Sequence, residues 1–129
     1  MTWKKRGFIY KPDGSLNWSK THAQAPAPVK IDEDTIRVYF STRNEKGLTQ
    51  TGYVDVDIDS PSKVKNIGKE PFLRLGKPGT HNDCGTMIGS ILVNDDEISF
   101  YYTGWHVPVT VAYDCNIGLL KSDNFDKVN

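Results

Sequence analysis

The stretch Gly79-Thr-His-Asn-Asp-Cys-Gly85, followed directly by Thr86-Met-Ile-Gly-Ser-Ile-Leu-Val93, decides the fold. Its first part is a glycine-bracketed turn that holds His81, Asn82 and Asp83, and its second part is a nearly unbroken apolar run. Such a run is typical of a strand that is buried on both faces. The turn therefore presents a polar cluster with one carboxylate at the mouth of a buried strand, a common place for a ligand site in β proteins.

The flanking segments also alternate as strands do, and no stripe of helical period interrupts them. Asn94–Asp96 predicts a tight turn into an aromatic strand. Two prolines keep Thr21–Lys30 extended, and Pro71 suits an outer strand. The chain is thus predicted to be all-β, with further strands at Lys4–Tyr10, Thr35–Arg43, Gln50–Ile58, Lys69–Gly76, Glu97–Trp105 and Ile117–Leu120.

Composition narrows the functional classes. The 129 residues suit one domain, and 16 basic against 16 acidic residues argue against a nucleic-acid or anionic-membrane surface. No apolar run reaches the roughly 20 residues of a membrane span, and no secretory signal is visible. Cys84 and Cys115 could pair, but free thiols are expected in the cytoplasmic location that these features predict. No Cys/His metal spacing occurs, and no cofactor is expected.

The second half of the chain repeats the first. Val29–Arg43 aligns without a gap on Ile91–Trp105, 62 residues later, so that Ile36 falls on Ile98 and Tyr39 on Tyr101. Each unit reads as an inner strand, an acidic turn, an aromatic strand, a loop and a glycine-containing third strand. A four-stranded unit repeated at such a period predicts the blades of a β-propeller.

The count of blades is incomplete. We expect one full blade at residues 21–76, an incomplete blade at 79–129, and a strand at 4–10 that would close the last blade. Two blades leave apolar faces uncovered, because a repeat unit buries its faces against its neighbours. The chain is therefore expected either to be the front part of a longer propeller or to associate with other copies to close a ring.

Five motifs resemble the five-bladed propeller glycosidases, and most closely a group similar to glycoside hydrolase family 43, which is related to families 32, 62 and 130. They occur in order and at matching spacing over nearly the whole chain. The motifs are Thr21-His-Ala-Gln-Ala-Pro26, Arg37-Val-Tyr-Phe-Ser-Thr-Arg43, Leu75-Gly-Lys-Pro-Gly-Thr-His-Asn-Asp-Cys-Gly-Thr-Met87, Tyr101-Tyr-Thr-Gly-Trp105 and Ile117-Gly-Leu-Leu-Lys-Ser-Asp123.

The resemblance implies hydrolysis of glycosidic bonds in an oligo- or polysaccharide, and it covers two of five blades. Three departures bear on catalysis. Ala25-Pro26 or Ala27-Pro28 stands where the family has an Asp on its first inner strand, and Asn82-Asp83 stands for the group's Asp-Asp pair. The family's general acid is a Glu in a third blade, so the 129 residues are expected to be inactive alone.

Asp83 is the predicted catalytic residue, as the base or as the group that modulates the pKa of an acid. Its other interpretation is a carboxylate that binds backbone amides of its own turn. Asn82 could bind a sugar hydroxyl or shape the same turn. His81 replaces the group's usual Phe and could contact a subsite.

The remaining predicted sugar contacts lie at strand ends. His22 and Gln24 flank the first inner strand, where they could bind sugar or make polar contacts in the core. Arg43 and Trp105 occupy equivalent repeat positions, and Trp105 with His106 could stack a sugar ring, although a recurring aromatic more often packs.

Two other functional classes remain. A non-catalytic carbohydrate-binding or self-assembling module fits the single well-placed carboxylate. A nucleic-acid or protein scaffold is disfavoured by the neutral charge.

Overall fold

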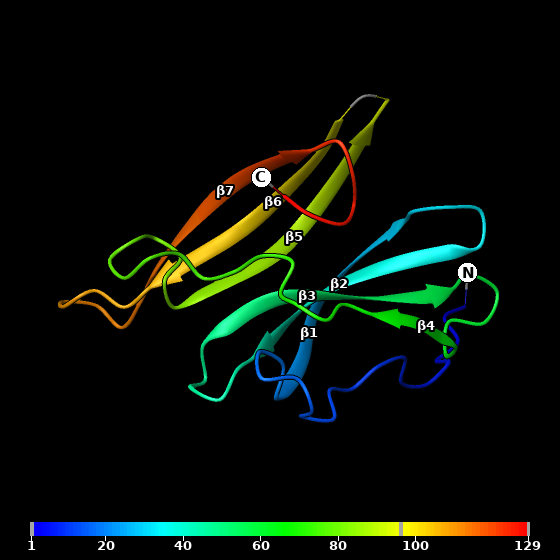
Figure 1. Cartoon of the computed structure of the whole chain (residues 1–129), viewed down its shortest axis with the longest axis horizontal. Helices are drawn as coiled ribbons and strands as arrows, with labels where there is room; N and C mark the ends of the chain where they lie inside the picture. Colours follow the sequence, from blue (N-terminus) through cyan, green and yellow to red (C-terminus); the bar gives the residue numbers. More distant parts are fainter. Residues whose placement is uncertain (1, 96, 129) are drawn as a thin grey trace.

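The structure is a computed structural model that describes residues 2–95 and 97–128 (Figure 1). The described residues form strands and loops with no helix, so the all-β prediction is confirmed. They include no helix long and apolar enough to cross a membrane. In chain order the strands are β1 Thr21–Lys30, β2 Thr35–Arg43, β3 Thr49–Asp57, β4 Val64–Ile67, β5 Gly85–Asn94, β6 Glu97–His106 and β7 Asp114–Ser122.

Strands β1 to β4 form an antiparallel group in which β2 pairs with β1 and β3, and β4 pairs with β3. Side chains alternate between its two faces. Arg37, Tyr39 and Tyr53 lie on one face, called here the front, while Val38 and Phe40 lie on the back. This alternation is the one that the sequence pattern predicts.

Strands β5 to β7 form a second antiparallel group. A single parallel bridge, Thr49 to Gly85, joins it to the first group, so all seven strands belong formally to one open sheet. Figure 1 shows the two groups approaching at the start of β5 and spreading apart toward the other end. We call them the first and the second sheet.

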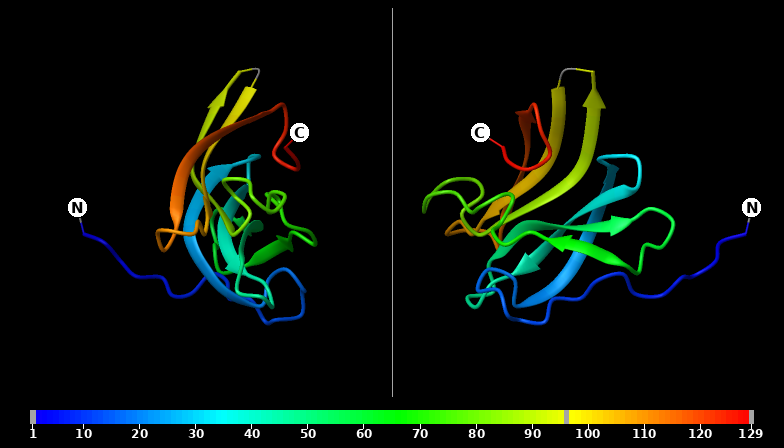
Figure 2. Two further views of the ribbon diagram at one scale, coloured as in Figure 1. Left: turned by 90° about the vertical axis from the view of Figure 1, so that its left-hand side faces the viewer. Right: turned by 45° about the vertical axis from the view of Figure 1, so that its right-hand side comes forward.

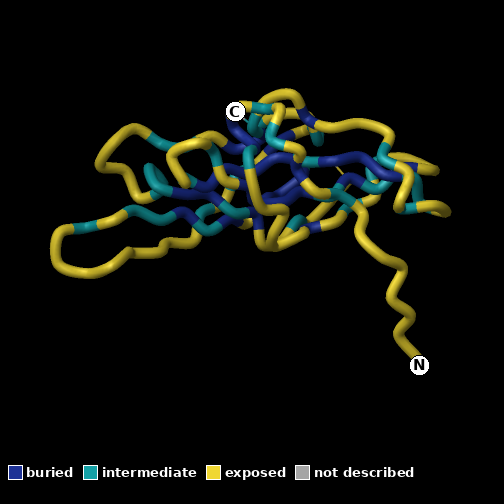
Figure 3. Tube along the Cα trace, turned by 90° about the horizontal axis from the view of Figure 1, so that it is seen from below, coloured by how far each residue is buried: buried dark blue, intermediate teal, exposed yellow. Residues whose placement is uncertain are grey.

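The main core lies between the sheets. The rings of Tyr39 and Phe72 are 4.6 Å apart, and Phe100 of the second sheet lies 5.5 Å from Tyr39 and 5.1 Å from Phe72. Tilted and edge-on aromatic pairs at such distances add to the stabilisation by burial. Figure 3 shows the buried segments running through the middle of the molecule.

The front of the first sheet thus faces the back of the second. Ile98, Phe100 and Tyr102 of β6 point into the shared core. Their repeat equivalents on the back of the first sheet form a smaller cluster around Phe40, and Tyr10 of the N-terminal segment packs against it at 5.2 Å between rings. The sheets are therefore stacked front to back in the same sense.

The front of the second sheet is open. Tyr101 and Leu119 pair across β6 and β7 on this face, and they are 39% and 47% exposed. Ile117, on the same face, is 85% exposed. Tyr101 is the repeat equivalent of Tyr39, which is fully buried. Neighbouring apolar side chains left exposed in this way commonly mark a surface that packs against another unit.

Two predicted strands are wrong. Residues 4–10 form no strand within this chain: Tyr10 packs against Phe40, while the residues before it extend away from the sheets (Figure 2), with Trp3 97% and Phe8 95% exposed, and a closing role on a later blade stays a prediction. The outer strand is β4, not Lys69–Gly76. The latter segment instead sends Phe72 and Leu73 into the core, and backbone bonds to Thr51 hold it there. Asp96 of the predicted Asn94–Asp96 turn lies outside the described residues.

Candidate functional site

The turn before β5 is held by its own polar groups. Gly79 has a φ of 86°, which glycine adopts without strain, and its N–H donates to Asp83 Oδ2 at 2.7 Å. The amide and hydroxyl of Thr80 donate to the carbonyl oxygen of Lys77 at 3.0 and 2.7 Å. The turn therefore holds the Asp83 side chain in a defined position just before the start of β5.

Asp83 serves the turn with one oxygen and leaves the other free. Oδ1 is buried and has no hydrogen-bond partner among the described residues. The pKa of Asp83 is lowered, first by the hydrogen bond from the Gly79 amide, then by the neighbouring Cys84 thiol, with a smaller contribution from the charge of His106. The carboxylate is thus ionised at neutral pH. The bond from Gly79 to Oδ2 supports the structural interpretation of Asp83. The unpaired Oδ1 is the atom on which a catalytic role would depend.

His106 lies next to this carboxylate and is left similarly unsatisfied. Its Nδ1 is buried without a hydrogen-bond partner among the described residues. Buried polar atoms are nearly always paired, so two unpaired atoms on interacting residues call for an explanation. Each of the two atoms could bind a water or a substrate hydroxyl.

Trp105 is positioned by close contact with glycine. A Cβ built on Gly85 would lie 2.0 Å from the Trp105 ring, so only glycine allows the ring to lie over the start of β5. The Trp105 carbonyl also accepts a hydrogen bond from the Cys84 amide at 3.1 Å. The ring lines a mainly apolar hollow of about 430 Å³ together with Met87 and Tyr113. Trp105 combines the packing role with an accessible aromatic surface.

His81 and Asn82 differ in what they do. Asn82 Oδ1 accepts from the Thr80 hydroxyl at 3.1 Å, and its carbonyl accepts from the Gly76 amide, so it shapes the turn. His81 is exposed and its Nε2 lies 3.0 Å from the Tyr102 hydroxyl. The polar contact between Tyr102 and His81 has no signal in the sequence pattern.

The start of β1 is irregular and exposed. His22 and Ala25 have φ values of 66° and 50°, and the register of β1 against β2 shifts on both sides of Gln24. Positive φ in non-glycine residues is strained, and such strain tends to occur at functional sites. His22 Nδ1 lies 2.8 Å from the hydroxyl of the preceding residue, Thr21. No sequence signal marked this distortion.

The predicted site residues fall into two groups at the same end of the sheets. Asp83, His81, Asn82, Trp105 and His106 gather around the start of β5. Arg43, which pairs with Thr21 and Thr49, stands with His22 and Gln24 at the end of the first sheet. The Thr49 amide donates to the Cys84 carbonyl at 3.2 Å and so joins the two ends.

The two cysteines and the potential metal ligands bear on thiol and metal chemistry. Cys84 and Cys115 form no disulfide. The pKa of the Cys84 thiol is raised, mainly by its burial and to a smaller extent by the neighbouring Asp83. A raised pKa disfavours the nucleophilic thiolate. Within residues 2–95 and 97–128, no three His, Cys, Asp or Glu side chains are grouped so that they could hold a metal ion.

A scan of known protein families finds none that matches the chain. Two Mycobacterium tuberculosis proteins are similar to it: uncharacterized protein Rv1502 of strain H37Rv and uncharacterized protein MT1551 of strain CDC 1551. Each is 42% identical over 123 residues, or 95% of this chain. The chain spans 41% of the length of these curated relatives.

Proposed function

We propose that this chain forms two blades of a five-bladed propeller glycosidase, similar to glycoside hydrolase family 43, that acts on an oligo- or polysaccharide. The observation that carries the proposal is the stacking of the two sheets. Tyr39 on the front of the first sheet is fully buried by the second sheet, while its equivalent Tyr101 is 39% exposed. Units that stack front to back in one sense leave one face open for the next unit, and they form a closed ring where the rotation between units closes.

The length of the relatives is sufficient for a ring of five such units. The matched 123 residues are 41% of each relative, so each relative has about 300 residues. The repeat spacing of 62 residues, from Ile36 to Ile98, then leaves room for about five units. The front of β5–β7 would be covered by the next unit, and the exposed N-terminal arm would complete the last.

The chemistry that fits Asp83 is that of the ionised partner in a carboxyl pair. Glycosidases use one ionised and one protonated carboxyl group on opposite sides of the bond, and no cofactor. The lowered pKa of Asp83 suits the ionised role, as base or as modulator of the acid. The acid would come from a later blade, and Trp105 and His106 would contact the sugar.

The test compares the 129-residue chain with the full-length Rv1502 relative on a panel of aryl glycosides and oligosaccharides. We expect the relative to hydrolyse at least one substrate and the 129-residue chain to hydrolyse none. Replacing the relative's residue at the position of Asp83 with its amide, or with Ala if it is not a carboxylate, should lower kcat by about 100-fold or more. Turnover by the 129-residue chain alone, or none by the relative on the whole panel, would contradict the proposal.

The open front face of β5–β7 also favours a second candidate, a carbohydrate-binding module that assembles from several copies. Light scattering after size-exclusion chromatography separates the two. A discrete oligomer that Leu119→Ser dissociates supports assembly, whereas a monomer, or aggregation without a fixed stoichiometry, supports the two-blade interpretation.

A further inference from the structure

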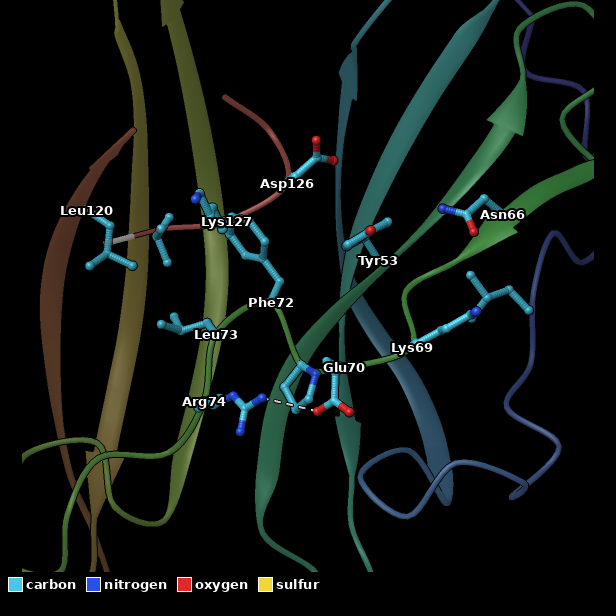
Figure 4. A pocket seen from close by; sticks show the side chains of 13 residues that line it. Tyr53, Asn66, Lys69, Glu70, Phe72, Leu73, Arg74, Leu120, Asp126 and Lys127 are labelled. Carbon is cyan, nitrogen blue, oxygen red and sulfur yellow. Dashed lines mark hydrogen bonds and ion pairs between the residues drawn. The ribbon is translucent and has the colours of Figure 1, made fainter. Parts of the chain in front are cut away.

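A second hollow lies away from the Asp83 turn. It measures about 750 Å³ and opens between the loop after β4 and the C-terminal segment (Figure 4). Its walls include Tyr53, Lys69, Phe72 and Lys127, and none of the predicted site residues. Its volume falls within the range of small-ligand sites. We call it the lateral groove.

The floor of the groove is rigid and partly aromatic. Phe72 and Leu73 are each 8% exposed and belong to the main core. The Tyr53 ring is held by Arg37, whose guanidinium carbon lies 3.8 Å from the ring centre. A preformed apolar floor with a few polar groups above it is the usual form of a small-molecule site.

The charges around the groove leave a positive excess. Its acids are already engaged, since Glu70 pairs with Arg74 at 3.1 Å and Asp126 pairs with Arg37 at 2.9 Å. Lys69 and Lys127 have no carboxylate within 4.0 Å among the described residues. An anionic ligand in the groove could therefore pair with either ammonium group without breaking an existing ion pair.

We propose that the lateral groove binds an acidic sugar unit, with its carboxylate attracted by the positive charge of the rim and its ring over the apolar floor. The two rim lysines lie on different walls, Lys69 on the loop after β4 and Lys127 on the C-terminal segment, so each contributes separately to that charge (Figure 4). The saccharide part of this proposal rests on the proposed function; the preference for an acidic unit rests on the charges of the groove alone.

The experiment titrates the ¹⁵N-labelled 129-residue chain with sodium D-glucuronate and, in parallel, with D-glucose in matched sodium chloride. These sugars share a ring and differ by the carboxylate. We expect glucuronate to shift the backbone amides of Lys69–Arg74 and Asp126–Val128, with glucose at least about fivefold weaker. Lys69→Gln and Lys127→Gln should each weaken glucuronate by about twofold to fivefold, as for exposed charge pairs. Lys46→Gln, on the turn between β2 and β3, is the matched control and should change nothing.

Equal binding of both sugars, no groove shifts with glucuronate, or full binding by the double Lys69→Gln and Lys127→Gln variant would overturn the proposal. Shifts at Gly79–Gly85 and Trp105 report separately on the proposed function. If they occur without groove shifts, the lateral groove fails and the proposed function stands. If only the groove responds, the groove stands and the sugar site at Asp83 loses support.

Discussion

Arg37 and Asp126 lie 89 positions apart in the sequence, yet the guanidinium Nη1 donates to the carboxylate at 2.9 Å. The same nitrogen donates to the Phe125 carbonyl at 2.8 Å, and the rest of the guanidinium binds both oxygens of Asp55, at 2.7 and 2.9 Å. Burial alone would lower the pKa of Arg37, but its hydrogen bonds to Asp55 and Asp126 raise it overall. One buried side chain thus ties the segment after β7 to the first sheet.

Arg37→Ala should destabilise the chain strongly because it leaves Asp55 buried and unpaired. The side chains of Arg37 and Asp55 are 5% and 8% exposed, and breaking such a pair on one side costs about 3–5 kcal/mol. Asp126→Asn is the control, because its side chain is 77% exposed and its pairing should be worth about 1 kcal/mol or less. Urea unfolding measures both. Similar losses in the two variants would contradict the buried network.

Tyr39→Phe and Tyr101→Phe test the unequal burial of equivalent repeat positions. The Tyr39 hydroxyl donates to the Phe125 carbonyl at 2.7 Å, so its removal should lower the free energy of unfolding by about 1 kcal/mol. Tyr101 is partly exposed, and its substitution should change stability by about 0.5 kcal/mol at most. Denaturant titration measures the free energy of unfolding of both variants. Equal losses would show that the two tyrosines are equally buried and that the stacking described here is wrong.

Gly85→Ala should disturb the candidate site, whereas Gly89→Ala on the same strand should not. A Cβ on Gly85 meets the Trp105 ring at 2.0 Å, and forcing atoms into a packed place costs about 1–3 kcal/mol. At Gly89 the nearest atom lies 3.9 Å away. Tryptophan fluorescence and thermal unfolding check this pair. Because Trp3 and Trp18 also fluoresce, both glycine variants are made in a Trp3→Phe, Trp18→Phe background. An unshifted Trp105 signal in Gly85→Ala would show that the ring lies elsewhere.

The hydrogen bond from Gly79 to Asp83 predicts an acid-sensitive turn. Because the folded pKa of Asp83 is lowered, its contribution to stability is present above the unfolded value of about 3.9 and is lost as pH falls through the folded pKa. The Gly79 amide shift, followed by NMR, should therefore titrate with a midpoint below about 3.9. Asp83→Asn should abolish this titration. A midpoint above the ordinary value would mean that the carboxylate is free of the turn.

The alternation of apolar and polar residues predicted β2 and β3 closely, because a strand with one buried face must alternate. For β5 the apolar run predicted a strand buried on both faces, and this is wrong: only its first half is buried, and Leu92 and Val93 are each 50% exposed, because no other described segment covers the far end of the second sheet. The argument from alternation failed for Lys69–Gly76. Phe72 and Leu73 are apolar there because they fill the space between the sheets from a loop, and a loop can do this when its backbone bonds go to Thr51.

The candidate site was predicted only in part. Asp83, Trp105 and His106 were selected from the turn and the aromatic strand, and the structure brings them together because Gly85 pairs with Trp105. The sequence could not predict that Oδ2 of Asp83 is bound by the turn while Oδ1 is unpaired among the described residues. Nor could it predict the strained backbone at His22 and Ala25.

By itself, the sequence determined most of the strands, the repeat and the turn that carries Asp83, because these depend on local pattern and spacing. Only the tertiary structure decided which face of each sheet is covered. Tyr39 and Tyr101 occupy the same place in the repeat and could not be told apart until the neighbour of each was known. The burial of a side chain depends on which other segments pack against it, and those segments can lie far away in the sequence.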